Sequence, residues 1–141
     1  MKKIVNGVET DMTPEEIAEL EAWRTPTLDQ LKEAKKAESA AARYAAETSG
    51  VTVNGRLFLT TREDVRILES AMDKIRRGLV EEVVWKCGDG KFIKLKANNI
   101  ESIEAAILTH IQGCFDKEAL IAGALEACTS HEELSGVAIT Y

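Results

Sequence analysis

The chain contains nearly the same phrase twice, and this repetition is the feature that most limits how the chain can fold. IVNGVETDMTPEEIAEL fills residues 4–20, and TVNGRLFLTTREDVRIL fills residues 52–68. Asn-Gly between apolar residues is a strong hairpin signal, because a type I′ turn needs positive φ at both central positions. Seven residues after each Asn stands a Thr, Thr13 or Thr61, followed by an acidic residue three positions later, as at a helix N-cap. Each copy therefore predicts a β-hairpin leading into a helix.

The two copies differ in how much apolar surface they can bury. The second copy has apolar strands and a helical apolar stripe of Val65, Leu68, Met72 and Ile75 that ends at Gly78. Thr60 with Glu63 is an alternative capping frame for its helix. The first copy has a polar returning strand and a short helix that stops at Thr25-Pro26. Burying so few side chains yields roughly 1.5–3 kcal/mol each, too little against ordering costs of ~1–2 kcal/mol per residue.

We therefore expect residues 1–26 to be an attachment arm, a hairpin plus a short helix, that orders against another surface. Its expected partner-binding residues are the apolar ones, namely Ile4, Val5, Ile17, Leu20 and Trp23. A true duplication is less favoured than repeated use of common turn and cap chemistry.

The segment between the copies is rich in Ala, Glu and Lys. Residues 27–49 have high helix propensity, a capping Thr27 and little apolar bulk. Such a helix is either a solvated connector, which we favour, or one strand of a small-residue coiled coil in a homo-oligomer such as a trimer. Gly50 ends it, so the predicted main domain covers residues 50–141.

A second hairpin is predicted over residues 82–96, with Gly88-Asp89-Gly90 as a three-residue loop and Gly90 left-handed. That register places bulk on one face (Val83, Trp85, Cys87, Ile93 and Leu95) and charge on the other. Phe92, Lys94 and Lys96 on the charged face are either a solvated sheet surface or a docking face with Phe92 as its apolar anchor.

The remaining residues predict helices. We expect Asn98 to cap a helix with Glu101 as its partner, Asp116 to start a second helix over 117–127 after a bend, and Ser130 with Glu133 to cap a short third one. The apolar end, 137–141, is a candidate edge strand. The predicted fold class is α+β: a small antiparallel sheet, from 51–60 and 82–96, packed against two to three helices at 62–77 and 99–128.

One constellation could carry chemistry. His110 and Cys114 are four residues apart, and Cys128 and His131 are three apart, both spacings being compatible with zinc ligands. Since no CxxC motif accompanies them and His110 falls on an apolar stripe, we expect no metal, and a Cys114–His110 nucleophile pair is weaker still. No catalytic residues and no cofactor are expected; a small metal-dependent enzyme or regulator is the least favoured function.

The composition of the chain limits which classes of partner it can bind. A net charge of -6 argues against nucleic acid, whose phosphates need clustered Lys and Arg. No apolar run approaches the ~18 residues of a membrane span. Three cysteines leave at least one unpaired, which favours buried free thiols in a reducing compartment.

Several stretches carry a family resemblance. GVTVNGRLFLTTRED, VVWKCGDGKFIKL and AAILTHIQGCFDKEALIAGAL, within residues 50–134, resemble a domain of unknown function in bacteriophage and prophage tail proteins, often encoded near tail-fibre and fibre-assembly genes. The opening IVNGVETDMTPEEIAELEA resembles the N-terminal segment of many small phage tail proteins. The last helices have more large β-branched residues and cysteines than the family pattern suggests, which leaves the partner surface open.

The resemblance implies a non-enzymatic tail-associated structural protein, in tail-fibre or baseplate attachment, that acts through protein–protein contacts. The alternative is a tail-fibre assembly chaperone that is absent from the finished particle. The implied partner is a tail-fibre or baseplate protein. The implied location is the virion tail, or the bacterial host cytoplasm during assembly.

Overall fold

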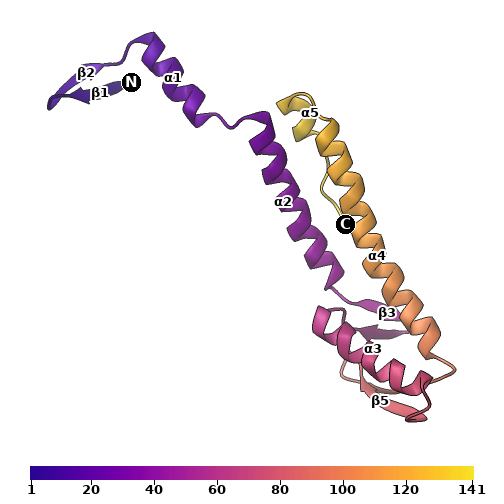
Figure 1. Cartoon of the computed structure of the whole chain (residues 1–141). Helices are drawn as coiled ribbons and strands as arrows, with labels where there is room; N and C mark the ends of the chain where they lie inside the picture. Colours follow the sequence, from indigo (N-terminus) through magenta and orange to yellow (C-terminus); the bar gives the residue numbers. More distant parts are fainter.

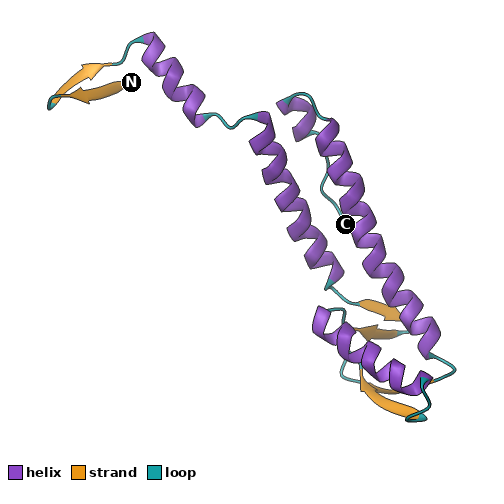
Figure 2. Cartoon of the chain, in the orientation of Figure 1, coloured by secondary structure: helices purple, strands orange, loops and turns teal.

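The computed structural model describes residues 1–141 and has an α+β fold, as predicted (Figures 1 and 2). Its elements follow in the order β1 (Lys2–Val5), β2 (Val8–Asp11), α1 (Pro14–Arg24), α2 (Leu28–Glu47), β3 (Val51–Val53), β4 (Arg56–Phe58), α3 (Arg62–Arg76), β5 (Glu82–Lys86), β6 (Phe92–Lys96), α4 (Ile100–Ala127) and α5 (His131–Ser135). None of the helices is long and apolar enough to cross a membrane.

Both Asn-Gly pairs form the predicted turns. Asn6 and Asn54 each have φ of 50°, and the glycines that follow have φ of 79° and 77°. Each hairpin leads into a helix, with Thr13 capping α1 and Thr61 capping α3. Thr61 is thus the correct capping frame, and Thr60 has a different role described below.

The predicted single sheet is wrong. β1–β2, β3–β4 and β5–β6 are three separate antiparallel pairs. The two pairs of the main domain form no shared ladder; the backbone bond between them runs from the Gly88 N–H to the Leu57 carbonyl at 2.7 Å. Because β3 and β4 are three residues each, they offer too few backbone groups to continue a ladder.

The β5–β6 hairpin has the predicted register. Val83 pairs with Leu95 and Trp85 with Ile93, while Cys87 N–H donates to the Lys91 carbonyl at 2.8 Å. Gly90 is left-handed, with φ of 81°. The inward face joins a core formed by β3, β4, α3 and the first half of α4, whose buried residues are Val53, Phe58, Leu68, Ala71, Met72, Ile75, Cys87, Leu95, Ile100, Ile103 and Ile107.

The helix over residues 27–49 exists, but it is not a solvated connector. α2 lies antiparallel along α4, forming a long helical hairpin (Figure 1). Its small residues allow close approach, and Leu28 and Leu31 pack on a second cluster of Leu125, Cys128 and Leu134. The Lys32 ammonium also donates to the Glu126 carbonyl at 2.9 Å. How the chain divides into domains stays a prediction.

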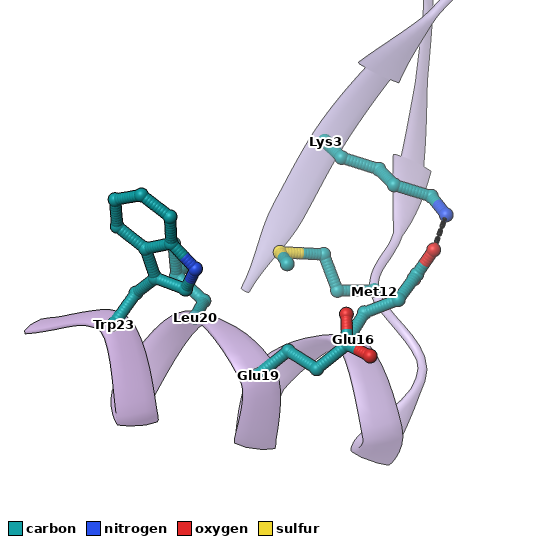
Figure 3. Close-up of a pocket in the computed structure, with 6 residues that line it drawn as sticks. All are labelled: Lys3, Met12, Glu16, Glu19, Leu20 and Trp23. Atoms are coloured by element: carbon teal, nitrogen blue, oxygen red, sulfur yellow. Dashed lines mark hydrogen bonds and ion pairs between the residues drawn. The ribbon is translucent and has the colours of Figure 1, made fainter.

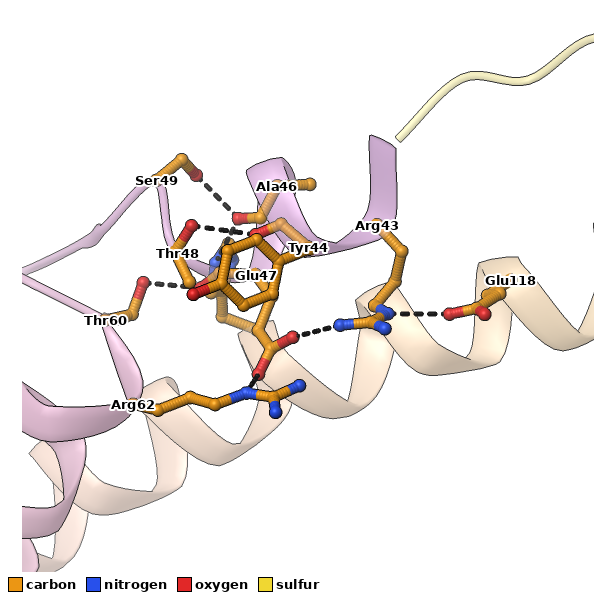
Figure 4. Close-up of polar contacts among 10 residues, drawn as sticks. Arg43, Tyr44, Ala46, Glu47, Thr48, Ser49, Thr60, Arg62 and Glu118 are labelled. Atoms are coloured by element: carbon orange, nitrogen blue, oxygen red, sulfur yellow. Dashed lines mark hydrogen bonds and ion pairs between the residues drawn. The ribbon is translucent and has the colours of Figure 1, made fainter. Parts of the chain in front are cut away.

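A charged cluster fixes the end of α2 against α3 and α4 (Figure 4). Glu47, 4% exposed, forms ion pairs with Arg43 and with Arg62, the latter at 3.3 Å. Arg43 also donates to Glu118 of α4 at 2.6 Å. Burial alone would raise the pKa of Glu47, but the hydrogen bonds from Arg62 and Arg43 outweigh it and lower that pKa. Every charge in the cluster is therefore paired.

Thr60 closes the same junction. Its hydroxyl donates to the Glu47 carbonyl at 2.6 Å and accepts from the Gly50 N–H at 2.9 Å. Gly50 has φ of 94°, and a Cβ there would lie 3.2 Å from the Phe58 carbonyl oxygen. Thr60 and Gly50 thus set the turn from α2 into β3.

Three predictions for the C-terminal part need correction. Asn98 is not a cap: α4 begins after Asn99, whose amide instead bonds the Lys96 N–H at 2.8 Å and the Lys94 carbonyl at 2.9 Å. α4 also runs unbroken through Phe115 and Asp116, and Asp116 accepts from Gln112 within the helix at 3.0 Å. A continuous helix is favoured because α2 contacts α4 on both sides of Asp116, through His110 before it and Glu118 after it.

The third correction concerns the chain end. Residues 137–141 form no strand and return between α2 and α4 (Figure 1). The Tyr141 hydroxyl lies 2.6 Å from the Ser39 hydroxyl, and Ser39 is 2% exposed. Ser130 caps α5 as predicted, accepting from the Glu133 N–H at 3.1 Å.

Candidate partner-binding surfaces

The N-terminal arm, residues 1–26, stands away from the rest of the chain. β1, β2 and α1 project beyond the start of α2, at the opposite end of the helical hairpin from β5 (Figure 1). α1 has no buried residue. A segment of this kind has most of its surface free for a partner.

Local contacts shape the arm. The Thr13 hydroxyl accepts from the Glu16 N–H at 3.2 Å, and the Glu16 carboxylate accepts from the Thr13 N–H at 2.9 Å. Glu16 also forms an ion pair with Lys3 of β1, which lowers the pKa of Glu16. A second capping box, Thr27 with Gln30, starts α2. The arm is thus a hairpin fastened to a helix, followed by an independently capped helix.

A hollow of about 390 Å³ lies between the hairpin and α1. Met12, Leu20 and Trp23 form its apolar part, while Lys3, Glu16 and Glu19 form its polar rim (Figure 3). Leu20 and Trp23 were expected in a partner site from the sequence. Met12 and the Lys3–Glu16 pair were missed, because only the folded hairpin brings them to α1.

The predicted arm residues differ in exposure. Ile4 is 77% exposed and Trp23 is 90% exposed, whereas Ile17 and Leu20 are half-buried within the arm. Val5 is exposed beside the Asn6-Gly7 turn. A tryptophan with nine-tenths of its surface in water is unusual, since Trp is highly buried on average. It is therefore the strongest single candidate for a contact with a partner.

The outward face of the β5–β6 hairpin is the second predicted surface. Phe92 is 64% exposed, with the Lys86 ammonium 6.0 Å from its ring centroid. Lys94 and Lys96 lie 3.2 and 3.7 Å from Glu82 across the hairpin. These pairs lower the pKa of Glu82, Lys94 being the principal cause. The face is therefore less basic than its three lysines suggest.

The His/Cys constellation is not assembled. His110 bonds the Ala46 carbonyl at 3.0 Å, joining α4 to α2, and Cys114 is buried on the same helix. Cys128 lies eighteen residues beyond His110, about 27 Å at the rise of an α-helix. No group of three or more His, Cys, Asp or Glu side chains comes together in a geometry that could hold a metal ion.

The three cysteines are buried and free, as expected. Burial raises the pKa of the Cys87 thiol, with Asp89 adding to the effect. The Cys128 thiol donates to the Ala124 carbonyl at 3.2 Å. All three therefore serve as small core residues.

Comparison with known proteins gives a family for most of the chain. Neither the curated proteins nor the solved structures contain a significant match. A protein-family match to DUF4376, a domain of unknown function, covers residues 30–140, from the first turn of α2 to the chain end beside Tyr141. The matched segment contains the helical hairpin, the α3 core and the C-terminal segment between α2 and α4, and omits the arm. The chain belongs to the DUF4376 family.

Proposed function

We propose that this chain is a non-enzymatic phage or prophage tail-associated protein, in tail-fibre or baseplate attachment, and that residues 1–26 grip the partner. The observation that carries the proposal is the exposed arm. It lies outside the DUF4376 segment, and its Ile4 and Trp23 are the two most exposed large hydrophobic residues of the chain. Aromatic side chains such as that of Trp23 are enriched in the cores of protein–protein interfaces.

The chemistry of the arm supports a protein partner. Tryptophan is the residue type most enriched among interface positions that dominate binding energy, since it buries a large area with little loss of conformational freedom. Beside it, Leu20 and Met12 line an apolar hollow. An apolar side chain of the partner, entering that hollow, would remove Trp23 from water.

The tail context comes from the resemblance of residues 4–22 and 50–134 to phage tail proteins. The arm would bind a tail-fibre or baseplate protein, and the DUF4376 domain would act as a cap or spacer. The protein would then reside in the virion tail, or in the host cytoplasm while tails assemble.

A tail-fibre assembly chaperone is the alternative. It is favoured by the lack of any buried residue in α1, because an arm held mainly by polar contacts suits binding that is later released. A chaperone and a permanent tail part use similar interface residues, so the distinction lies in where the protein ends up.

Fractionation of a lysate of the producing bacterium tests the proposal. Particles are separated from unassembled tail parts by density and sedimentation, and the chain is followed with an antibody. A tail component is expected in the particle fraction at a fixed ratio to the fibre protein. Co-purification only with unassembled fibre protein would indicate the chaperone, and absence from both fractions would refute a tail role.

A further inference from the structure

The β5 strand has an open edge. β5 pairs with β6 on one side and has no strand on the other. The Cys87–Lys91 hydrogen bond sets the alternation of the ladder, so the backbone groups of Val84 and Lys86 point away from β6. None of the backbone bonds outside regular elements involves residues 82–86, and Val84 is 61% exposed.

The opposite edge of the same hairpin is covered at its Lys94–Lys96 end. On β6, the outward N–H of Lys96 and the outward carbonyl of Lys94 both bond the Asn99 side chain, at 2.8 and 2.9 Å. Natural sheets protect their edges with proline, bulges, charges or a covering element. β5 has charges only at its ends, Glu82 and Lys86, and Val-Val-Trp between them. The β5 edge therefore lacks the side-chain cover that Asn99 gives to β6 and is open to another strand.

A groove accompanies the open edge. A hollow of about 290 Å³ lies between α3 and β5, lined on the strand side by Val83, Val84 and Trp85. Its helix side has Arg66, Ile67, Ser70, Ala71 and Lys74. Ile67 is 44% exposed, and Arg66 has only one distant ion-pair partner, Glu63 at 4.0 Å. The groove is apolar along its floor and basic at its helix rim.

We infer that strand β2 in the arm of a second copy of this chain adds to the free edge of β5 and occupies this groove. Strand addition to an exposed edge is a common way to bind an extended segment, with main-chain bonds giving affinity and side-chain pockets giving specificity. The inference rests on the proposed binding role of the arm and names one of its partners.

Charge selects β2 from the two arm strands. β2 is Val-Glu-Thr-Asp, whereas β1 is Lys-Lys-Ile-Val. All four β2 residues are exposed. The Met12 N–H donates to the Met1 carbonyl at 3.0 Å, which leaves the backbone groups of Glu9 and Asp11 facing outward. An acidic strand with outward backbone groups complements the Arg66 and Lys74 rim.

In the structure the chain's own arm points away from its own β5 (Figure 1). α2 has 20 residues and spans about 30 Å. The arm starts at one end of α2 and β5 lies beyond the other (Figure 1). Donor strand and acceptor edge therefore belong to different copies, and the contact is head-to-tail. Such a contact generates either a closed ring, for which a trimer is one solution, or an open filament.

Full-length variants that block one side of the contact provide the test. Val84→Pro removes an outward N–H of β5 without touching the ladder to β6, since proline is tolerated at a strand edge. Arg66→Glu with Lys74→Glu reverses the charge of the groove rim. This double variant replaces Val84→Pro as the edge-blocked form if the proline variant fails to fold. Glu9→Lys with Asp11→Lys blocks the donor strand. Glu15→Lys with Glu21→Lys is the control, the same charge change on α1.

Sedimentation velocity over a concentration series measures the outcome. We expect the unmodified chain and the control to self-associate, and each blocked variant alone to stay monomeric. A mixture of an edge-blocked and a strand-blocked variant should form a one-to-one complex that grows no further, because only one productive contact remains. Circular dichroism confirms that each variant is folded.

Two results would overturn the inference: an unmodified chain that is monomeric throughout, or oligomers that survive both kinds of block. Neither result bears on the fractionation experiment. A monomer that still enters tail particles would refute strand addition alone, whereas a self-associating chain absent from tails and tail parts would refute the proposed function alone.

Discussion

Glu47 shows how a single residue can hold three helices together. It ends α2, its side chain is 5% exposed, and it contacts Arg43 of its own helix and Arg62 of α3. Arg43 in turn reaches Glu118 of α4 and stacks 4.5 Å from the Phe115 ring centroid. Loss of one member of a buried ionic cluster is costly because it leaves the other charges without partners.

Replacing Glu47 by alanine should therefore lower the free energy of unfolding by about 3 kcal/mol. Urea denaturation at neutral pH measures it. Glu33→Ala is the matched control, an exposed glutamate on the same helix whose loss should cost no more than about 0.5 kcal/mol. Equal effects of the two substitutions would show that the cluster does not hold the helices together.

Glu69 gives the protein a pH-dependent stability. Glu69 is exposed, so solvent screens its interactions, but partial desolvation and the neighbouring Glu104 carboxylate still raise the pKa of Glu69 from 4.5 to about 7, while Arg76 acts in the opposite direction. Between those values the folded chain keeps a proton that the unfolded chain has lost. The contribution of Glu69 to stability is thus present below pH 4.5 and declines as pH rises toward about 7.

Glu69→Gln should flatten this part of the pH profile and make the protein more stable at alkaline pH. The measurement is the free energy of unfolding of each variant as a function of pH. Glu63→Gln, on the same helix, is the control for the change in net charge. The prediction fails if both variants keep the slope of the unmodified chain.

Residue-level chemistry was the most predictable part of the sequence. Asn6-Gly7, Asn54-Gly55, Thr13 and Thr61 act locally, so their turns and caps follow from a few neighbouring residues. Asn99 could not be assigned in the same way, because its partners, Lys94 and Lys96, are set by the β6 edge that it closes.

The boundaries of the helices depend on packing partners that are distant in the sequence. Asp116 has the chemistry of an N-cap, yet α4 continues through it under the cover of α2. α2 in turn looked polar all round, because its buried positions include Ser39 and Glu47, which the sequence alone would place on a solvated face. Their partners, Tyr141, Arg62 and Arg43, are hydrogen-bonding side chains rather than an apolar stripe.

A pair of substitutions tests the continuity of α4. Thr61→Ala removes the side chain that caps α3 and should cost about 1 kcal/mol of unfolding free energy. Asp116→Ala removes only a bond within a helix and should cost at most about 0.5 kcal/mol. Thermal or urea unfolding compares them. If Asp116→Ala lowered the free energy of unfolding as much as Thr61→Ala, Asp116 would be acting as a helix cap and α4 would be interrupted there.

At the scale of the whole molecule, the chain combines a DUF4376 domain with a projecting arm. The sequence predicted the weakness of the arm, since its few apolar residues cannot repay the ordering of a separate core. It did not predict that residues 27–49 pack along α4, because the two helices lie more than fifty residues apart in the sequence. It did not predict the open β5 edge either, because the expected sheet joined residues 51–60 to the 82–96 hairpin and the structure keeps them as separate pairs.

Removal of the arm should leave the domain intact. A chain that starts at Thr27 keeps the capping box of α2, in which Thr27 accepts from the Gln30 N–H at 3.2 Å. The arm adds no buried residue through α1. The unfolding midpoint in urea should therefore match that of the full chain, and a markedly lower midpoint would show that the arm supports the domain.

Co-purification of the chain with tail particles or unassembled tail fibres, with and without residues 1–26, tests the central claim most directly. Both forms are expressed with the same tag in the producing bacterium, and the fraction of each that accompanies tail material is measured. Our account predicts that the full chain accompanies this material and that the folded, arm-less chain does not. Equal co-purification of the two forms would contradict it, because attachment would then lie in the DUF4376 domain.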